Sequence, residues 1–290
     1  MKFNLPEIKH DYSGFFALAK FYEQSKECVL EDIEIDLNAT WWLDADMCAA
    51  FGAILYRLGS NLNTINLINI PSSVERILSK NGFLGHYGRA RIPDSYGTTI
   101  SYKRFDASDG RYFNRYIEKE FIGRSEIPDM SPRLLKRFRA SIFEVFNNSV
   151  THSFTKLGIF SCGQFFPKHN KLDFTLADLG VGIRQNVGEY VGTEISAEEA
   201  IVWATEANNT TKRGGVPGGL GLKLLQEFIG LNGGRLQIVS DSGYWQRAGN
   251  EVSVSPLGHS FPGTVVNFEI NTADTQTYIL ASELDADDIF

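Results

Sequence analysis

The sequence predicts an α/β protein in which a small N-terminal domain precedes a larger C-terminal one. Three observations support this: strand and helix patterns alternate over roughly the first 80 residues, a glycine-rich joint follows at 85–97, and a long amphipathic helix lies between strands in the second half. With 290 residues, 43% of them hydrophobic, the chain is long enough to bury two cores. We place the domains at 1–90 and 91–275, followed by an acidic tail at 276–290.

The N-terminal domain shows two strand patterns and two helix patterns. Apolar residues alternate at 29–37 and again at 65–70, which predicts two strands. Helical spacing predicts helices at 41–58 and 71–81, the second ending before a glycine. Strand, helix, strand, helix with short connections predicts a small α/β layer.

The C-terminal domain begins with a strand at 99–105 and a helix at 109–121, and then a longer helix follows. Ser131 can accept hydrogen bonds from the first free N–H groups of this longer helix, and Pro132 suits its first position. Apolar residues then recur at helical spacing and predict a buried face: Leu134, Phe138, Ile142, Val145 and Phe146.

A polar stripe runs along the same helix. Glu144, Asn148 and His152 are four residues apart, so they lie on one face. A carboxylate there can orient or deprotonate an attacking water or hydroxyl, and an amide oxygen is a ligand suited to Mg2+. Taken alone, this spacing is common and favours an ordinary solvated helix face.

A strand at 174–178 ends in Asp178 and a glycine turn with Gly180 and Gly182. A carboxylate at that point can accept a hydrogen bond from the exocyclic amine of adenine, and glycines let a base approach the backbone. A lone D-x-G-x-G pattern also occurs in methyltransferases. The third glycine of a dinucleotide-binding fingerprint is absent, since Ile183 follows Gly182.

Farther along, a glycine-rich loop leads directly into a helix, and a strand at 263–270 follows later. The N–H groups and positive dipole end of such a helix suit phosphates, although a mobile surface loop has the same composition. The loop does not close with the G-K-[ST] of a P-loop. Thr264, at the start of the strand, could reach a base through water.

The order of these four blocks resembles the GHKL superfamily of ATPases and kinases, which is built on the Bergerat fold. The resemblance implies a two-layer α/β sandwich, with a mixed sheet and helices on one face, that binds ATP with Mg2+. It implies that Glu144 is the catalytic base, Asn148 the Mg2+ ligand, and Asp178 the residue that recognises adenine. The implied nucleotide site contains Asn148, His152, Asp178, Gly180, Gly182, Ile183, Thr211, Lys212, Gly218, Gly219, Leu220, Gly221, Leu222 and Thr264.

Within that superfamily, the chain is most similar to the anti-sigma-factor serine kinases. Their helix tends to read E-x-x-x-N-[AS]-x-x-H, which Glu144, Asn148, Ser149 and His152 match. A sensor histidine kinase instead needs a phosphoacceptor histidine on a long dimerisation helix, usually followed by an acidic residue. His10 is followed by Asp11 but has no long coiled-coil helix around it, so we interpret it as a surface histidine.

The N-terminal domain resembles the STAS domain, the fold of the antagonist proteins that anti-sigma-factor kinases phosphorylate. Where those antagonists carry the phosphorylated hydroxyl, this chain has Asp44, Ala45 and Asp46. We therefore expect that this domain is not a substrate of the kinase. The carboxylates then either mimic a charged state or form a docking surface, or Asp44 simply caps the following helix.

The composition limits the partners. A formal net charge of -7 and a pI near 5.3 argue against a nucleic-acid partner, which needs a clustered basic face. No stretch approaches the roughly 20 apolar residues of a membrane span, and no signal peptide is visible, so we expect a cytoplasmic protein without a membrane partner. Three widely spaced cysteines indicate reduced thiols: Cys28, Cys48 and Cys162.

Two functions are compatible with these patterns. One is a Mg-dependent ATP-binding protein that hydrolyses ATP or phosphorylates a protein serine or threonine in a regulatory partner-switching system. The alternative is a non-catalytic, nucleotide-gated protein-interaction module. Both imply ATP, Mg2+ and a regulatory protein partner. Homodimerisation is common in the resembled superfamily, although the sequence shows no interface. A methyltransferase built on the Asp178 turn accounts for neither the helix stripe nor the glycine-rich loop.

Overall fold

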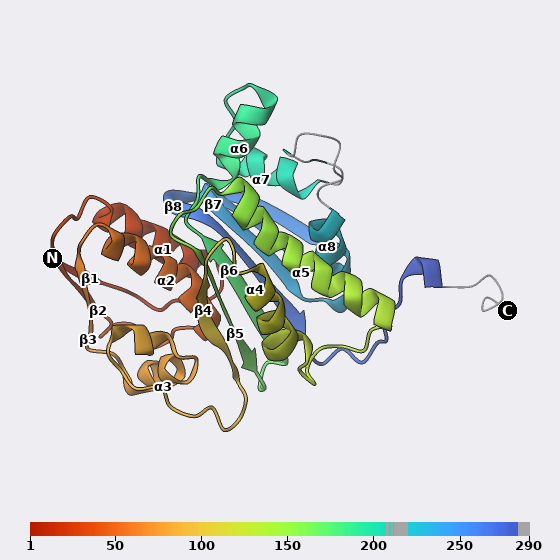
Figure 1. Ribbon diagram of the computed structural model, residues 1–290, viewed down its shortest axis with the longest axis horizontal. Coiled ribbons are helices and arrows are strands. Elements are labelled where there is room, and N and C mark those ends of the chain that lie inside the picture. The colour runs from red at the N-terminus through yellow and green to blue at the C-terminus, as the bar shows by residue number, and fades with distance from the viewer. Residues whose placement is uncertain (207–208, 210, 212–219, 284–290) are drawn as a thin grey trace.

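The computed structural model describes residues 1–206, 209, 211 and 220–283, and it confirms the α/β class. A three-stranded parallel sheet lies at the N-terminal end of the molecule and a five-stranded antiparallel sheet forms its centre (Figure 1). The N-terminal elements are β1 (Lys2–Asn4), α1 (Tyr12–Ser25), β2 (Asp32–Asp36), η1 (Ala45–Met47), α2 (Cys48–Ser60), β3 (Thr64–Ile68), α3 (Ser72–Lys80) and η2 (Phe83–Tyr87).

The large sheet has the strand order β4-β5-β6-β8-β7. Its elements, with the helices and turns between them, are β4 (Thr99–Phe105), α4 (Gly110–Ile117), η3 (Glu118–Ile122), α5 (Pro132–His152), β5 (Ile159–Phe166), β6 (Lys171–Asp178), α6 (Gly182–Val191), α7 (Ala197–Thr205), α8 (Leu220–Asn232), β7 (Arg235–Ala248), β8 (Glu251–Asn271) and η4 (Ala281–Glu283). The expectation that this sheet is mixed is wrong, because all four pairings between its described strands are antiparallel. Short hairpins join β5 to β6 and β7 to β8, and a hairpin reverses the chain direction.

Local signals explain where several elements begin. The Ser131 hydroxyl accepts a hydrogen bond from the Leu134 N–H at 3.1 Å and Pro132 is the first residue of α5, as predicted. Ser196 and Glu199 form a capping box at the start of α7. Asp11 caps α1 by accepting a hydrogen bond from Gly14 N–H at 3.0 Å. The sequence analysis predicted neither α1 nor β1.

Both faces of the large sheet are covered, so the expectation of helices on one face only is also wrong. Helices α4, α5 and α8 pack on one face, and α1 and α2 of the N-terminal half pack on the other (Figure 1). Strand β6 shows the division, because successive side chains point to opposite faces. Leu172, Phe174 and Leu176 join the core under α5, whereas Ala177 joins the core under α1 and α2.

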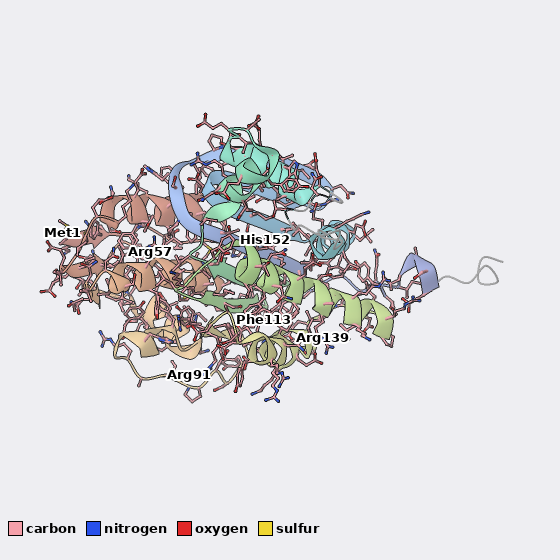
Figure 2. The ribbon with its side chains drawn as sticks, turned by 45° about the horizontal axis from the view of Figure 1, so that its top comes forward. Met1, Arg57, Arg91, Phe113, Arg139 and His152 are labelled. Carbon is pink, nitrogen blue, oxygen red and sulfur yellow. The ribbon has the colours of Figure 1, made fainter. Side chains whose placement is uncertain are left out.

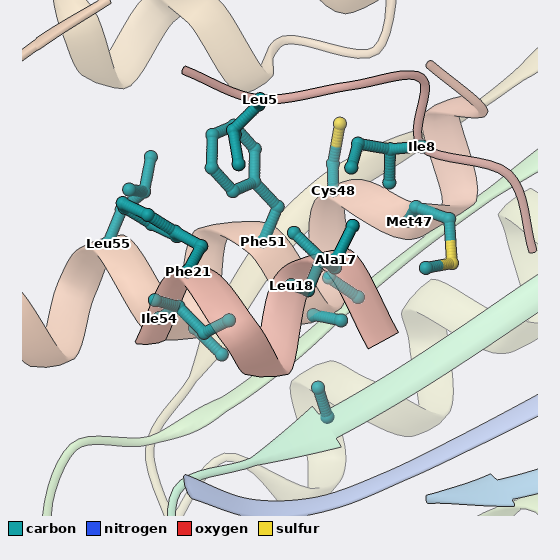
Figure 3. Packing of buried hydrophobic residues seen from close by; sticks show 14 of the residues in the cluster. Leu5, Ile8, Ala17, Leu18, Phe21, Met47, Cys48, Phe51, Ile54 and Leu55 are labelled. Atoms are coloured by element: carbon teal, nitrogen blue, oxygen red, sulfur yellow. The ribbon is translucent and has the colours of Figure 1, made fainter. Parts of the chain in front are cut away.

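The core under α1 and α2 is continuous with the sheet. Figure 3 shows Leu18 and Phe21 of α1 close to Phe51 and Ile54 of α2. The same hydrophobic cluster includes sheet residues such as Val265. The N-terminal half is therefore held against the sheet by shared apolar packing, while the domain boundary at residue 90 stays a prediction.

Two further findings bear on the sequence expectations. Among the described helices, none combines the length and the apolar character needed to cross a bilayer. The three cysteines are free and buried, in line with the expected reduced thiols.

Candidate functional site

A cavity lies between the C-terminal part of α5, the end of β6, an interior stretch of β8, and helices α6 and α7; we call it the α5 cavity. Its volume is about 150 Å³, some ten times the roughly 10–15 Å³ that one water needs, so it can admit an organic group. Eight of the predicted site residues line it: Asn148, His152, Asp178, Gly182, Ile183, Thr211, Leu222 and Thr264. Residues from five separate elements and from the segment after α7 thus converge on one space.

Asp178 is the buried acid of this cavity. It is the last residue of β6, is only 2% exposed, and pairs with Thr264 in the β6–β8 register. Its Oδ1 accepts a hydrogen bond from Gly180 N–H at 2.9 Å. Burial raises the pKa of Asp178 to about 6, although hydrogen bonds from Gly180 and Ser149 favour the ionised form. Near neutral pH the cavity therefore holds a carboxylate that can accept a further hydrogen bond.

Glycines around Asp178 allow a close approach of backbones. A Cβ on Gly263, which has φ +148°, would lie 2.1 Å from the Asp178 carbonyl oxygen. A Cβ on Gly180 would lie 2.2 Å from the Ser153 carbonyl oxygen, so Gly180 packs against the end of α5 and does not line the cavity. Gly182 starts α6 with φ +80°, a conformation that favours glycine.

Part of the polar stripe on α5 faces the cavity, as predicted. His152 lies at the C-terminal end of α5 (Figure 2), and its Nδ1 is 3.1 Å from Thr211 Oγ1, within hydrogen-bond distance. The Asn186 amide of α6 donates to the His152 carbonyl oxygen at 2.8 Å, which joins the two helices. Asn148 also lines the cavity, and within the described ranges its side chain makes no hydrogen bond.

Glu144, the predicted base, lies outside the cavity lining. Its Oε2 accepts a hydrogen bond from Gly221 N–H at 3.0 Å, in the first turn of α8. The carboxylate thus satisfies one of the free N–H groups of this helix, where the dipole favours negative charge. A Cβ on Gly221 would lie 2.4 Å from the same oxygen, so the glycine is needed for this contact. Gly221 itself does not line the cavity.

Several predicted phosphate-binding residues cannot be placed. Lys212, Gly218 and Gly219 lie outside the described residues. Leu220 begins α8, and Leu222, in the same first turn, lines the cavity. The part of the expected loop that the structure describes is therefore the start of α8, beside Glu144 and at the edge of the cavity.

About half of the cavity lining was not predicted as part of the site from the sequence. The missed residues are Val145, Ser149, Ser153, Asn186, Val187, Trp203, Ala204, Asn209, Ile238 and Val266. Ser149 and Ser153 directly follow Asn148 and His152, so helical geometry alone would have placed them beside the polar stripe. Trp203 and Ala204 come from α7, and only the tertiary fold brings that helix to the cavity.

The carboxylates of Asp44 and Asp46 have neither of two roles that we considered, capping and docking, while the role of a charged mimic stays a prediction. Asp44 occupies the N-cap position of η1, but its side chain makes no capping hydrogen bond. Asp44 and Asp46 are both buried, so neither is presented as a docking surface. Hydrogen bonds draw them inward: Trp42 Nε1 donates to Asp44 Oδ1 at 2.6 Å, and Asn267 Nδ2 donates to Asp46 Oδ2 at 3.0 Å.

Neither the models of protein families nor the curated proteins contain a match to this chain. What the protein does must therefore be inferred from the residues of the α5 cavity and from the elements that carry them.

Proposed function

We propose that this protein binds ATP with Mg2+ in the α5 cavity and either hydrolyses it or transfers its γ-phosphate to a serine or threonine of a regulatory protein. The observation that carries the proposal is the position of Asp178. It is a buried carboxylate at the end of a central strand, next to Thr264 and facing the polar stripe of α5. We also propose, from the motif order, that the domain is a Bergerat-type sandwich with a STAS-like N-terminal half.

In this proposal Asp178 accepts a hydrogen bond from the exocyclic amine of adenine, and Thr264 lies beside the base. An ionised acceptor makes a stronger hydrogen bond than a neutral one. The buried, ionised carboxylate therefore gives the cavity a preference for bases that carry an amine. Gly182 and Ile183, at the start of α6, leave room for the base against the backbone.

Asn148 fits the role of a Mg2+ ligand. Its amide reaches the cavity without a hydrogen bond to any described residue, and Mg2+ binds amide oxygen together with water and phosphate oxygens. When bound, the ion neutralises charge on the triphosphate and polarises the γ-phosphoryl group. His152, one turn away, holds Thr211 at the cavity through the contact of Nδ1 with Oγ1.

Glu144 gives the site a way to respond to nucleotide. The Gly221 N–H that it binds is the type of group that binds phosphate at a helix N-terminus. A triphosphate that takes over this N–H releases the Glu144 carboxylate, one helical turn from Asn148, to orient or deprotonate the attacking water or hydroxyl.

The hydrogen bond from Gly221 to Glu144 also favours a second candidate function. A carboxylate that stays on the helix terminus does not activate water, and the protein then acts as a nucleotide-gated interaction module with little or no turnover.

The decisive experiment compares wild type with Glu144→Gln for ATP binding by calorimetry and for phosphate release, both with Mg2+. An enzyme loses turnover in this variant, by 100-fold or more if the residue acts as the base, but still binds ATP. Glu227→Gln, which removes an exposed carboxylate from the neighbouring helix α8, is the matched control and keeps wild-type turnover.

The results separate three cases. Wild-type binding without phosphate release excludes the hydrolase and leaves two candidates, transfer to a protein and the interaction module. A Glu144→Gln variant that turns over ATP at the wild-type rate removes Glu144 from the mechanism. No binding of ATP to the wild type contradicts both functions.

A further inference from the structure

A cluster of acidic residues surrounds His10 on the face of the large sheet opposite the α5 cavity. We call these residues the His10 cluster: His10, Asp44, Asp46, Asp173 and Glu269. The His10 side chain is only 13% exposed, so its interpretation as a surface histidine is wrong. The segment before α1 places His10 against two interior strands of the sheet, where it contacts carboxylates of Asp44, of Asp46 in η1, and of β6 and β8.

The two ring nitrogens of His10 face different carboxylates. Nδ1 lies 2.9 Å from Asp44 Oδ2 and 3.7 Å from Asp46 Oδ1. In a tetrahedral zinc site with bonds of about 2.1 Å, neighbouring donor atoms are about 3.4 Å apart. These three donor atoms therefore lie at separations that one metal ion can bridge, and all are within 4.8 Å of one another.

Unsatisfied polar atoms give independent evidence for a ligand at this point. Asp46 is completely buried, and its Oδ1 accepts no hydrogen bond from any residue that the structure describes. His10 Nδ1 is in ion-pair contact with Asp44 Oδ2 at 2.9 Å, but this contact lacks the geometry of a hydrogen bond. A native protein seldom leaves a buried polar atom unpaired, because the lost solvation is costly. Both atoms point to the same space, on the Nδ1 side of the ring.

The remaining atoms of these side chains are held by outer partners. Asp46 Oδ2 accepts hydrogen bonds from Asn267 Nδ2 at 3.0 Å and Thr175 Oγ1 at 3.3 Å, which turns Oδ1 toward His10. His10 Nε2 lies 3.3 Å from Glu269 Oε2. Metal-binding histidines usually donate their second ring N–H to a carboxylate, which leaves the other nitrogen free for the metal.

We propose that His10 Nδ1, Asp44 Oδ2 and Asp46 Oδ1 bind one Zn2+ ion, separately from the nucleotide site. One imidazole nitrogen and two carboxylate oxygens form a donor set that zinc accepts, and three protein ligands leave a fourth position for water. A surface pocket lined by Lys9, Trp42 and Lys171 leads to His10 and Asp44, so the ion has a path of entry.

The ion would also strengthen the contact between the two halves of the protein. All three ligands belong to the N-terminal half, whereas Asn267, Thr175 and Glu269, which hold the ligands in place, belong to the large sheet. A ligand that binds only the folded state raises its stability, so Zn2+ should raise the melting temperature of the apoprotein.

The test uses the full chain after treatment with a chelator, without nucleotide or Mg2+. One equivalent of Zn2+ is added, the protein is passed through gel filtration, and retained zinc is measured by elemental analysis. We expect about one ion per chain for wild type, and at least tenfold weaker binding for His10→Ala and for Asp46→Asn. His169→Ala, which removes an exposed histidine from the rim of the same pocket, should retain zinc as wild type does.

Two variants are needed because His10→Ala removes volume, whereas Asp46→Asn preserves the shape of a buried side chain; circular dichroism checks that each folds. The proposal is overturned if chelator-treated wild type neither retains zinc nor melts at a higher temperature with it. Retention by both variants at the wild-type level also overturns it. Asp178→Asn should bind zinc normally, so failure of the proposed ATP site leaves this result unaffected.

Discussion

Burial of the Asp178 carboxylate should lower the stability of the folded protein. The proposed function nevertheless requires this carboxylate. The pKa of Asp178 is raised from 3.8 to about 6, with burial as the largest cause. Each pKa unit corresponds to about 1.36 kcal/mol, so ionising this group in the folded protein costs about 3 kcal/mol near pH 7. Asp178→Asn removes the charge with little change in shape. We therefore expect this variant to be more stable than wild type at pH 7 by up to about 3 kcal/mol.

The dependence on pH follows from the direction of the shift. The folded chain holds the proton of Asp178 up to higher pH than the unfolded chain does, so the cost appears as pH rises from about 4 to about 6. Near pH 4 the carboxyl is protonated in the folded chain and about half protonated in the unfolded chain, so the advantage of Asp178→Asn should fall below about 1 kcal/mol. The same variant should bind ATP roughly tenfold to a hundredfold more weakly, because a hydrogen bond to a charged group is worth about 1.5–3 kcal/mol.

Urea unfolding of wild type and Asp178→Asn at pH 7 and at pH 4.5 measures this difference. Asp129→Asn, at an exposed position, is the control and should change stability by less than about 0.5 kcal/mol. A variant that is less stable than wild type at pH 7, or a gain that is the same at both pH values, would refute the reasoning. The carboxylate would then be stabilised by its hydrogen bonds more than burial penalises it.

Four further substitutions test glycine conformation, helix capping and core packing. Gly263→Ala should destabilise the protein by about 1–3 kcal/mol in urea unfolding, because its Cβ would meet the Asp178 carbonyl oxygen and its φ is strained for alanine. Gly59→Ala, which has open space around it in α2, should instead stabilise the protein by up to about 1 kcal/mol. Equal effects of the two substitutions would contradict this reasoning. Ser131→Ala should lower stability by about 1 kcal/mol, measured by thermal melting, through loss of the α5 cap, and an unchanged melting temperature would show that the cap is dispensable. Phe51→Ala should cost about 3–5 kcal/mol in urea, because it empties the core that joins α2 to the sheet, and a loss below 1 kcal/mol would mean that the core collapses around the gap.

Elements with local start signals could be predicted from the sequence. The strand at 99–105 has the predicted bounds, and α5 begins at Pro132 behind its Ser131 cap. Helix α1 was missed although Asp11 is a good cap, because its apolar residues are buried on more than one side and blur the period. Strand β8 was predicted only from 263 onward, since Pro256 and Pro262 argue against a central strand. Shifts in the β7–β8 register accommodate that stretch.

Predicting the candidate site depended on spacing along single elements. The stripe of Asn148 and His152 and the Asp178 strand end could be read locally, and the structure brings them together. The hydrogen-bond partner of Glu144 could not be predicted from the sequence, because the Gly221 N–H belongs to another helix, 77 residues farther along the chain. His10 shows the same limit. The carboxylates around His10 come from the start of η1, from β6 and from β8. No local sequence pattern predicts that these distant segments lie next to His10.

Strands β6 and β8 each carry chemistry on two sides. Asp178 and Thr264 face the α5 cavity, while Asp173 and Glu269 of the same two strands face His10. Because neighbouring residues in a strand point in opposite directions, inserting a single residue into the middle of β6 would turn Asp173 and Asp178 to the same face of the sheet, and one of them would lose its present surroundings. Evolution can therefore lengthen the loops at either end of these strands far more easily than it can alter their interior.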